Sequence, residues 1–483
     1  MQVIADLQLH SKYARAVSPQ MMIPFIGLWA KIKGIGLIAT GDWTHPLWMR
    51  EIKANLTEDG SGLLRLKKNE ERFDDESPMF LLESEVSCIY TQGGKGRRVH
   101  TLIWSPTIDT CDKINKELTR RGANLLSDGR PIIGLTSIQV AEVVFSIDPK
   151  CLIVPAHVWT PWFSLYGSKS GFDSISDCYG SYAKDIFAVE TGLSSDPSMN
   201  WRIKELDNRS IVSFSDAHSG PKLGREATVF ELQELSYQAI REAITQSVTT
   251  NFSDSTVKIG SQTPRHSNTS SSQVAISADS KIVVGRPRSA ISYTLEFYPE
   301  EGKYHYTGHR ACGVKQDPRE TGEKGTVCPV CGRPLTIGVM HRVEELAGRS
   351  EADLKLTTKE VPGTKVKGIY SEAFSYRPPY IKLVPLQEII AETIGGAPTA
   401  VNVQNEYKKL TNQFSNEFAV LLQTNVADIA KVSGEKVAQA IHKVREGDIV
   451  IDPGYDGVFG VVKIWGEDVK KKQAEDKKQL SLL

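Results

Sequence analysis

The chain has 483 residues, and its 58 Lys and Arg balance 58 Asp and Glu, so its formal net charge is zero. With 40% apolar residues it can bury sizeable cores, and we expect about two to four domains. Balanced charge excludes a polyanion-binding surface that covers the whole molecule, so any such surface must be local. The sequence shows no signal-peptide pattern and no run of about 18 apolar residues, so we expect a cytoplasmic protein without membrane association.

Residues 1–246 alternate short apolar runs with amphipathic stretches. The stretches MMIPFIGLWAKIKG and PLWMREIKANL have the pattern of helices. The strand-like runs are VIADLQL, GLIATGD, FLLESEVSCIY, VHTLIW, CLIVPAH, IFAVET and SIVSFSDAH. Such alternation predicts an α/β fold with parallel strands.

The rest of the chain changes character several times. Residues 247–288 contain SQTPRHSNTSSSQ, too polar to fill a core, which predicts a flexible linker or insertion. Residues 289–345 resume a β-like pattern and then carry clustered cysteines. Residues 346–483 are predicted to be mostly helical, from EYKKLTNQFSNEFAVLL and VADIAKVSGEKVAQAIHKV. The run GDIVIDPGYDGVFGVVKIW predicts a hairpin near the end, followed by the solvated tail KKKQAEDKKQ.

Side chains that can bind metals lie at the ends of the predicted strands of the first domain. In chain order they are Gln8, His10, Asp42, His45, Glu85, His100, His157, Asp216 and His218. The carboxyl ends of parallel strands in a barrel meet on one face, so these residues should converge there. Imidazole and carboxylate suit Zn²⁺, Mn²⁺ or Fe²⁺, and the set could hold two or three ions with Glu85 bridging. We expect two or three divalent ions of Zn, Mn or Mg. Any single histidine could be an ordinary core or surface residue, so the prediction depends on the whole set.

These residues lie in recognisable motifs. The segments DLQLHS, TGDWTHP, ESEVS, VHTLIW, VPAH and SDAH resemble, in order, the motifs of the polymerase and histidinol phosphatase (PHP) superfamily. The resemblance covers about the first 230 residues. It implies a PHP-type distorted (β/α)7 barrel with a trinuclear metal centre that hydrolyses phosphoesters.

The resemblance also implies ligand sets. The first ion would take Gln8, His10, Glu85 and Asp216, the second Glu85, His100 and His157, and the third His218 with Asp42 or His45. Asp216, His218, Glu85 and His157 would be the catalytic residues.

Two positions depart from the family pattern. Gln8 stands where the family usually has histidine, and Asp6 could assist it. Asp42 and His45 are spaced more widely than usual, which leaves open which of them binds. Glu190 could orient a ligand or be a structural acid.

An aromatic segment, HVWTPWFSLYGSKSGFDS, follows the predicted ligand His157. Aromatic rings beside small polar groups can hold an unstacked base, because every base has a π-face. An apolar lid packed on the barrel rim is the alternative. The candidate substrate-binding residues are Trp159, Trp162, Phe163, Tyr166, Ser168 and Lys169.

The second predicted domain contains GHRACG and CPVCGRP. The spacing of His309, Cys312, Cys328 and Cys331 suits a tetrahedral structural zinc in a small ribbon, with His305 or His341 as alternatives for the histidine. A closed zinc site leaves no position for chemistry, so its role would be folding. It could also present Arg310, Lys324 and Arg333 to phosphates, although a purely structural ribbon is the alternative.

The segments GKYHYTGHR, CPVCGRPLTIGV and YRPPYIKLVPLQEII extend the resemblance to the endonuclease Q family over nearly the whole chain. That resemblance implies a DNA-repair endonuclease that nicks DNA on the 5′ side of deaminated bases (hypoxanthine or uracil) or abasic sites. It also implies that residues 346–483 help to bind DNA. We expect a monomer, and we consider a sliding clamp as a partner. The alternatives are a PHP-type phosphatase of a small phosphoester and a non-catalytic DNA-binding protein.

Overall fold

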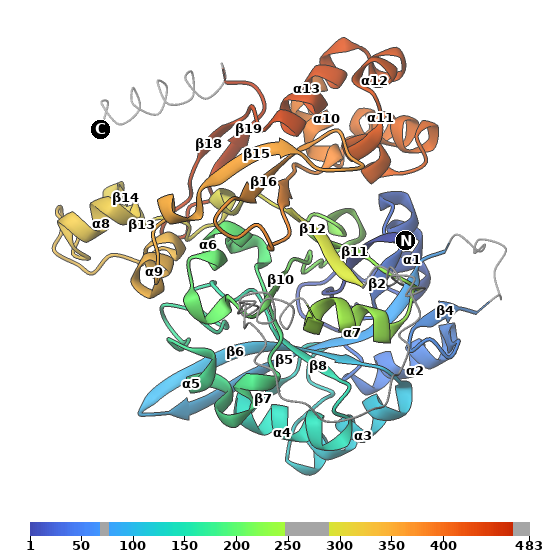
Figure 1. Ribbon diagram of the computed structural model, residues 1–483, viewed down its shortest axis with the longest axis vertical. Helices are drawn as coiled ribbons and strands as arrows, with labels where there is room; N and C mark the ends of the chain where they lie inside the picture. Colours follow the sequence, from blue (N-terminus) through green and yellow to red (C-terminus); the bar gives the residue numbers. More distant parts are fainter. Residues whose placement is uncertain (68–76, 247–288, 467–483) are drawn as a thin grey trace, which may run out of the picture.

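The computed structural model describes residues 1–67, 77–246 and 289–466 (Figure 1). The Ser-rich segment at 247–288 and the tail KKKQAEDKKQ, which were predicted to be a linker and a solvated end, lie outside the described residues. None of the described helices is long and apolar enough to cross a membrane.

Strands and helices alternate through the first half of the chain, as the sequence pattern predicted. The strands are β1 (Gln2–Asp6), β2 (Leu37–Ala39), β3 (Leu56–Glu58), β4 (Leu64–Leu66), β5 (Met79–Gln92), β6 (Lys95–Ser105), β7 (Ile132–Ile133), β8 (Leu152–Pro155), β9 (Ala188–Glu190), β10 (Ser210–Val212) and β11 (Ala227–Glu231). The helices are α1 (Ile23–Lys33), α2 (Pro46–Asn55), α3 (Ile108–Arg120), α4 (Ser137–Ile147), α5 (Ile175–Tyr179), α6 (Pro197–Trp201) and α7 (Tyr237–Gln246).

The strands form a mixed and distorted barrel. β1, β2 and β5 pair in parallel, whereas β6 runs antiparallel to both β5 and β8, and β11 runs antiparallel to β1. β9 and β10 form a separate parallel pair, and a backbone hydrogen bond from Val158 N–H to the Glu190 carbonyl links the segment after β8 to β9. The α/β class is therefore confirmed, but the expectation of uniformly parallel strands is wrong. Strands β2, β8, β9 and β10 are buried along their whole length, which explains their continuous apolar runs.

The second half of the chain continues the same sheet. β12 (Ala290–Glu296) pairs antiparallel with β11 and parallel with β17 (Tyr380–Lys382). The sheet then ends with β16 (Lys367–Ser371) and β15 (Leu356–Glu360). The structure thus joins the region after the Ser-rich segment to the barrel through backbone hydrogen bonds.

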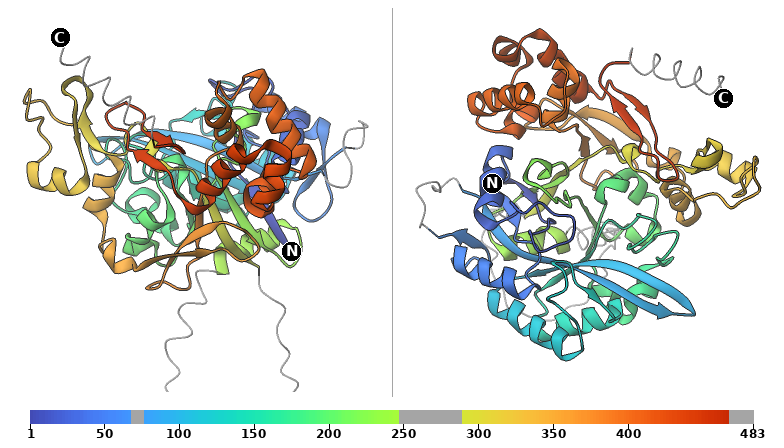
Figure 2. Two further views of the ribbon diagram at one scale, coloured as in Figure 1. Left: turned by 90° about the horizontal axis from the view of Figure 1, so that it is seen from above. Right: turned by 180° about the vertical axis from the view of Figure 1, so that it is seen from behind.

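Two further units extend from this sheet. The predicted ribbon contains β13 (Thr307–His309), β14 (Val314–Gln316), α8 (Pro318–Lys324) and α9 (Val339–Leu346). The C-terminal helices are α10 (Leu386–Ile394), α11 (Val401–Gln413), α12 (Val426–Ser433) and α13 (Glu435–Glu446). The predicted hairpin is confirmed as β18 (Val450–Asp452) paired with β19 (Val461–Lys463). Residues 289–466 form a second layer beside the barrel, with the ribbon at one end and the C-terminal helices at the other (Figures 1 and 2).

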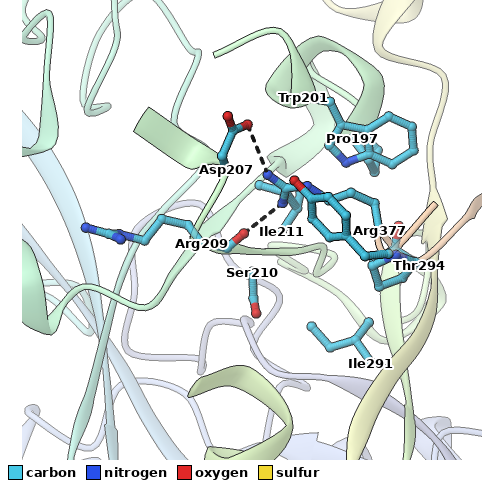
Figure 3. A pocket seen from close by; sticks show the side chains of 11 residues that line it. Pro197, Trp201, Asp207, Arg209, Ser210, Ile211, Ile291, Thr294 and Arg377 are labelled. Atoms are coloured by element: carbon cyan, nitrogen blue, oxygen red, sulfur yellow. Dashed lines mark hydrogen bonds and ion pairs between the residues drawn. The ribbon is translucent and has the colours of Figure 1, made fainter. Parts of the chain in front are cut away.

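Arg377 fastens this second layer to the barrel (Figure 3). Its buried guanidinium donates to the carbonyls of Arg209 at 2.8 Å and Leu206 at 2.6 Å, and it lies 3.8 Å from the Asp207 carboxylate. The cavity beside it has a volume of about 30 Å³, which is room for about one water molecule. This cavity is therefore too small for a substrate, and its surroundings serve packing.

Candidate active site

The β5–β6 hairpin carries two of the predicted ligands. Glu85 lies within β5 opposite Leu102, and His100 lies within β6 opposite Ser87. Both were expected at strand ends, but the two strands continue past them as a long hairpin. Because side chains alternate along a strand, Glu85 and Ser87 share a face, which brings His100 into diagonal contact with Glu85.

Three other predicted residues follow buried strands in unusual turns. Asp42, His157 and Asp216 have φ angles of 44°, 30° and 46°, in the left-handed region that residues other than glycine rarely adopt. Such backbone strain persists only where the surroundings impose it and is concentrated at functional sites. The turns direct these side chains toward the hairpin ligands.

Six predicted ligands come together in two sets of three. One set is His10, Asp216 and His218, and the other is Glu85, His100 and His157. Glu85 joins the two sets, because its Oε2 lies 3.0 Å from His10 Nε2 and its Oε1 lies 3.5 Å from His157 Nε2. The arrangement therefore suits a carboxylate that bridges two ions.

The spacing of the donor atoms fits metal coordination. His10 Nε2 lies 3.2 Å from Asp216 Oδ1, and His100 Nδ1 lies 3.1 Å from His157 Nε2. Ligand atoms about 2.1 Å from a tetrahedral ion are about 3.4 Å from one another, close to these separations. The mixed nitrogen and oxygen donors suit divalent ions such as Zn²⁺ or Mn²⁺.

Hydrogen bonds orient the imidazoles. His10 Nδ1–H donates to Asp42 Oδ1 at 2.9 Å, and His157 Nδ1–H donates to Thr160 Oγ1 at 3.2 Å. His218 Nδ1–H donates to the carbonyl of Asp216 at 2.8 Å. When each ring is neutral, its proton is on Nδ1, so the lone pair of Nε2 is available to bind an ion.

The electrostatics of the centre favour the metal-binding forms of Glu85 and His100 but the protonated form of His10. Burial acts to raise the pKa of Glu85, but His100 and Arg130 outweigh it and hold that pKa well below its ordinary value. Burial lowers the pKa of His100 to about 4, so its imidazole is neutral near pH 7. Burial acts to lower the pKa of His10, yet Asp42, Asp216 and Glu85 raise it well above its ordinary value. An ion that binds at His10 must therefore displace a proton.

The structure places Asp42 and His45 outside both sets. Asp42 Oδ1 accepts from His10, and its Oδ2 accepts from the N–H and hydroxyl of Ser11, each at 2.6 Å. Asp42 thus positions a ligand instead of being one. His45 is the residue before α2, at its N-cap position, and its ring stacks on Tyr13 at 4.5 Å. Among the described residues, the expected third set of His218 with Asp42 or His45 does not form.

Gln8 and Asp6 also differ from expectation. Gln8 Nε2 donates to Glu85 Oε2 at 3.2 Å, while its buried Oε1 has no hydrogen-bond partner among the described residues. Gln8 therefore lies at the centre but presents its amide nitrogen to the bridging carboxylate. Asp6 accepts from the N–H and hydroxyl of Ser215 and from Gly224 N–H, so it supports the turn before Asp216 and does not assist Gln8. Burial raises the pKa of Asp6 to about 6.

Glu190 and Arg130 complete the surroundings of the centre. Glu190 is fully buried and accepts from the backbone N–H of His157 at 2.7 Å. It therefore stabilises the strained turn at His157 and does not orient a histidine ring. Burial raises its pKa well above its ordinary value. Arg130 Nη1 lies 3.5 Å from Glu85 Oε2 and brings a positive charge to the centre. Sequence reasoning missed Arg130, because the loop that carries it, SDGRP, has no periodicity or motif that marks it.

A pocket of about 580 Å³ opens beside the donor sets. His100, His157 and Asp216 form its inner wall, and aromatic and basic side chains surround the rest. Phe163 lies 4.9 Å from the ring of His100, and Trp162 makes an edge contact with Tyr304 at 5.5 Å. The other lining residues include Arg98, Thr160, Pro161, Leu193, Ser194, Lys303 and His305.

Four of the six predicted substrate-binding residues do not line this pocket. Trp159 and Tyr166 are fully buried; Trp159 Nε1 donates to Asn200 and Tyr166 OH donates to Glu205. These two residues belong to the core, which agrees with the alternative that the aromatic segment is a lid packed on the barrel. Ser168 is partly buried and Lys169 is exposed, and neither lines the pocket. Trp162 and Phe163 do line it.

The structure brings His309, Cys312, Cys328 and Cys331 together in the ribbon. Burial acts to raise the pKa of Cys328, but the backbone N–H groups of Cys331 and Val330 outweigh it and lower that pKa to about 6, which favours the thiolate that zinc binds. His305 lines the pocket and His341 lies 3.5 Å from Glu345, so neither takes the place of His309. Of the basic residues expected to face phosphates, Lys324 pairs with Glu320 at 2.6 Å.

Known structures match the whole chain. The crystal structure of the lesion-specific endonuclease PfuEndoQ from Pyrococcus furiosus has 30% sequence identity and a TM-score of 0.73, and the match covers 97% of each chain. The chain belongs to the endonuclease Q family. An endonuclease Q complex with a 27-mer duplex that carries an abasic lesion at the active site matches equally well, with a TM-score of 0.73 at 30% identity over 97% of this chain and 98% of that one.

Other relatives of this member of the endonuclease Q family carry no assigned function. YqxK of Bacillus subtilis is 28% identical over 445 residues, or 89% of each protein. MJ0043 of Methanocaldococcus jannaschii is 32% identical over 319 residues, which is 65% of this chain but 32% of that protein, so the match spans about a third of its length. The family model of the MJ0043 C-terminal domain matches residues 385–448, the C-terminal helices. Membership of the endonuclease Q family confirms the predicted fold and a hydrolase acting on phosphodiester bonds.

Proposed function

We propose that this protein is a metal-dependent endodeoxyribonuclease that hydrolyses the phosphodiester on the 5′ side of a deaminated base or abasic site. The observation that carries the proposal is the shared wall between donor sets and pocket, since His100, His157 and Asp216 belong to both. A nucleotide whose phosphate lies at the donor sets would have its base within reach of the pocket. The relatives that support this choice are a lesion-specific endonuclease and a complex with a lesion-bearing duplex.

The pocket lining suits an extruded nucleotide. Trp162 and Phe163 offer ring faces for a base, and stacking on such rings is worth about 1–3 kcal/mol per base. Arg98 lies 5.5 Å over the ring of Phe163, and Lys303 adds a second cation at the pocket. These charges can pair with the phosphates that flank the base. A nucleotide must leave the helix to reach such a pocket, and a damaged or missing base costs less to unstack and unpair.

The chain's own residues would prepare the centre for hydrolysis. His10, Asp216 and His218 would hold one divalent ion, Glu85, His100 and His157 a second, and Gln8 would lie against the bridging carboxylate. Bound divalent ions supply Lewis-acid activation of water and neutralise phosphate charge. Asp42 fixes the ring of His10, Glu190 fixes the turn at His157, and Arg130 adds charge next to Glu85. Water adds to phosphorus as one bridging P–O bond breaks, and a proton passes to the leaving oxygen.

A nicking assay tests the proposal. End-labelled duplexes with a single deoxyinosine, uracil or abasic site are incubated with the protein and Mg²⁺, Mn²⁺ or Zn²⁺. We expect one cut on the 5′ side of the lesion and a loss of about 10²- to 10³-fold in Asp216→Asn, because this side chain is in one donor set and also lines the pocket. Asp109→Asn, on the exposed face of α3, is the matched control and should cut normally.

Other outcomes separate the alternatives. Equal cutting of undamaged DNA would contradict lesion specificity. Hydrolysis of a small phosphoester without any DNA cleavage would instead support a PHP-type phosphatase. Lesion binding without hydrolysis under any metal would support a non-catalytic DNA-binding protein. The monomeric state, the cytoplasmic location and recruitment by a sliding clamp stay predictions.

A further inference from the structure

The turn between β18 and β19, residues 453–460, is held rigidly against the ribbon. Asp456 accepts hydrogen bonds from the backbone N–H of Arg310 at 2.7 Å and from the hydroxyl of Thr336 at 2.6 Å. Gly457 N–H donates to the carbonyl of Lys303 at 2.9 Å, and Asp456 and Gly457 both adopt positive φ angles. A turn fixed at so many points holds its tip in a defined place.

The tip of this turn presents an exposed aromatic ring. Phe459 is 64% exposed and its neighbour Val458 is 40% exposed. Large apolar side chains on a rigid protrusion gain nothing for folding when they face water, so a cluster of them indicates a contact with something outside the chain. The exposure of Phe459 therefore indicates that this side chain contacts a binding partner.

The turn lies next to the pocket beside the donor sets. Lys303 Nζ lies 4.4 Å over the ring of Phe459, and Lys303 also lines the pocket. The next residue, Tyr304, lines the pocket too and contacts Trp162. Phe459, Lys303, Tyr304 and Trp162 thus form one continuous rim that leads from the turn to the place where the proposed nucleotide would be bound.

The charges around the tip favour a nucleic acid over an apolar protein surface. Lys303 and Arg310 flank the turn, and neither makes an ion pair with a carboxylate within the described parts of the chain. An aromatic ring with a cation over it, as Lys303 lies over Phe459, can stack on a base while the cation contacts a neighbouring phosphate.

We propose that Phe459 inserts into the DNA base stack at the lesion and fills the gap that the extruded nucleotide leaves. This inference rests on the proposed function. Extrusion costs a few kcal/mol of stacking and pairing, and apolar side chains that enter between base steps hold the distorted duplex. Phe459 supplies the ring, and the hydrogen bonds of Asp456 hold it in position.

The test compares two substrates that differ in whether a gap must be filled. In the first, an abasic site lies in a fully paired duplex. In the second, the same site lies in a bubble of unpaired bases, where the stack is already open. Phe459→Ala should lower kcat/KM on the paired duplex by about 10-fold or more and change it on the bubble by less than about twofold. Phe459→Trp, which keeps a stacking ring, should restore cleavage of the paired duplex.

Controls keep the outcomes distinct. Tyr376→Ala removes another exposed aromatic, beside the small cavity at Arg377, and should affect neither substrate. Unchanged cleavage of the paired duplex by Phe459→Ala, or equal losses on both substrates, would overturn the inference. If Phe459→Ala folds poorly, as judged by circular dichroism, Phe459→Ser takes its place with the same expected difference, because serine is small and polar and cannot fill the gap in the stack. Failure of the wild type to cut either substrate would contradict the proposed function instead.

Discussion

The barrel and the ribbon each bring together side chains that could bind a metal ion, but they do so in opposite ways. The barrel ligands extend from His10 to His218, and long-range strand pairing and strained turns bring them together. The ribbon ligands lie between His309 and Cys331, in a short segment that spacing alone brings together. In the barrel, the fold must therefore form before distant ligands can meet. In the ribbon, the ligands are close in sequence, so an ion could itself hold the segment in its fold.

Burial follows the same division. The barrel ligands sit within an extensive core that includes Trp43, Trp48 and Trp104, all fully buried. In the ribbon Val330 is 69% exposed and Val327 is 56% exposed, and a small unit with few buried apolar residues depends on its ion. We expect the barrel to keep its fold without metal and the ribbon to lose it.

The largest expected effect concerns Cys328. Cys328→Ser should release one zinc and unfold the ribbon, because structural zinc contributes about 10 kcal/mol or more to such a fold. Zinc content measured by mass spectrometry of the purified protein and hydrogen exchange over residues 305–338 check this. The same segment should stay protected in Glu85→Gln, which instead removes the carboxylate that joins the two barrel sets.

The opposite result would break the comparison. If Cys328→Ser keeps its zinc and its protection, the ribbon is stabilised by packing and not by an ion. If Glu85→Gln unfolds the barrel, the barrel depends on its centre as the ribbon does.

The candidate ribbon ligands and the positions of most barrel strands were predictable because each depends on local sequence. The spacing of Cys312, Cys328 and Cys331 indicated a candidate tetrahedral site without knowledge of the fold, although it left His309, His305 and His341 open as the fourth ligand. Apolar runs with the right period marked β5, β6 and β8. The barrel ligands His10, Asp216 and His218 required the order of motifs as well, since their sequence separation says nothing about contact.

The rest depended on tertiary structure. Asp42 looks like a ligand in sequence, but in the folded chain its carboxylate accepts from His10 Nδ1 and from Ser11, contacts that the sequence alone does not show. Glu85 and His100 were assigned to strand ends because nothing local shows that β5 and β6 continue as a hairpin. Phe459 was read as part of a hairpin turn, and only its exposure and its distance from Lys303 give it a further meaning.

The next largest effect concerns Asp42, which orients the barrel ligand His10 through a hydrogen bond. Asp42→Asn should weaken metal binding at the barrel by about 10- to 100-fold, because His10 loses the carboxylate that orients it. The ribbon ion should be unaffected. Titration of the metal-free barrel with Mn²⁺, followed by calorimetry, measures the loss; His45→Gln, which changes a ring outside both sets, is the control and should bind Mn²⁺ as the wild type does.

The smallest expected effect separates two tryptophans of one segment. Trp162 is 36% exposed at the pocket, whereas Trp159 is fully buried and hydrogen-bonded to Asn200. Trp162→Ala should raise KM for a lesion-bearing duplex by about 5- to 10-fold with little change in melting temperature, because it removes a stacking face. Trp159→Ala should instead cost about 3–5 kcal/mol of stability, as expected for a large side chain lost from a core. A fall in melting temperature of similar size in both variants would mean that Trp162 also serves packing, and the aromatic segment would then belong to the buried barrel and not to its rim.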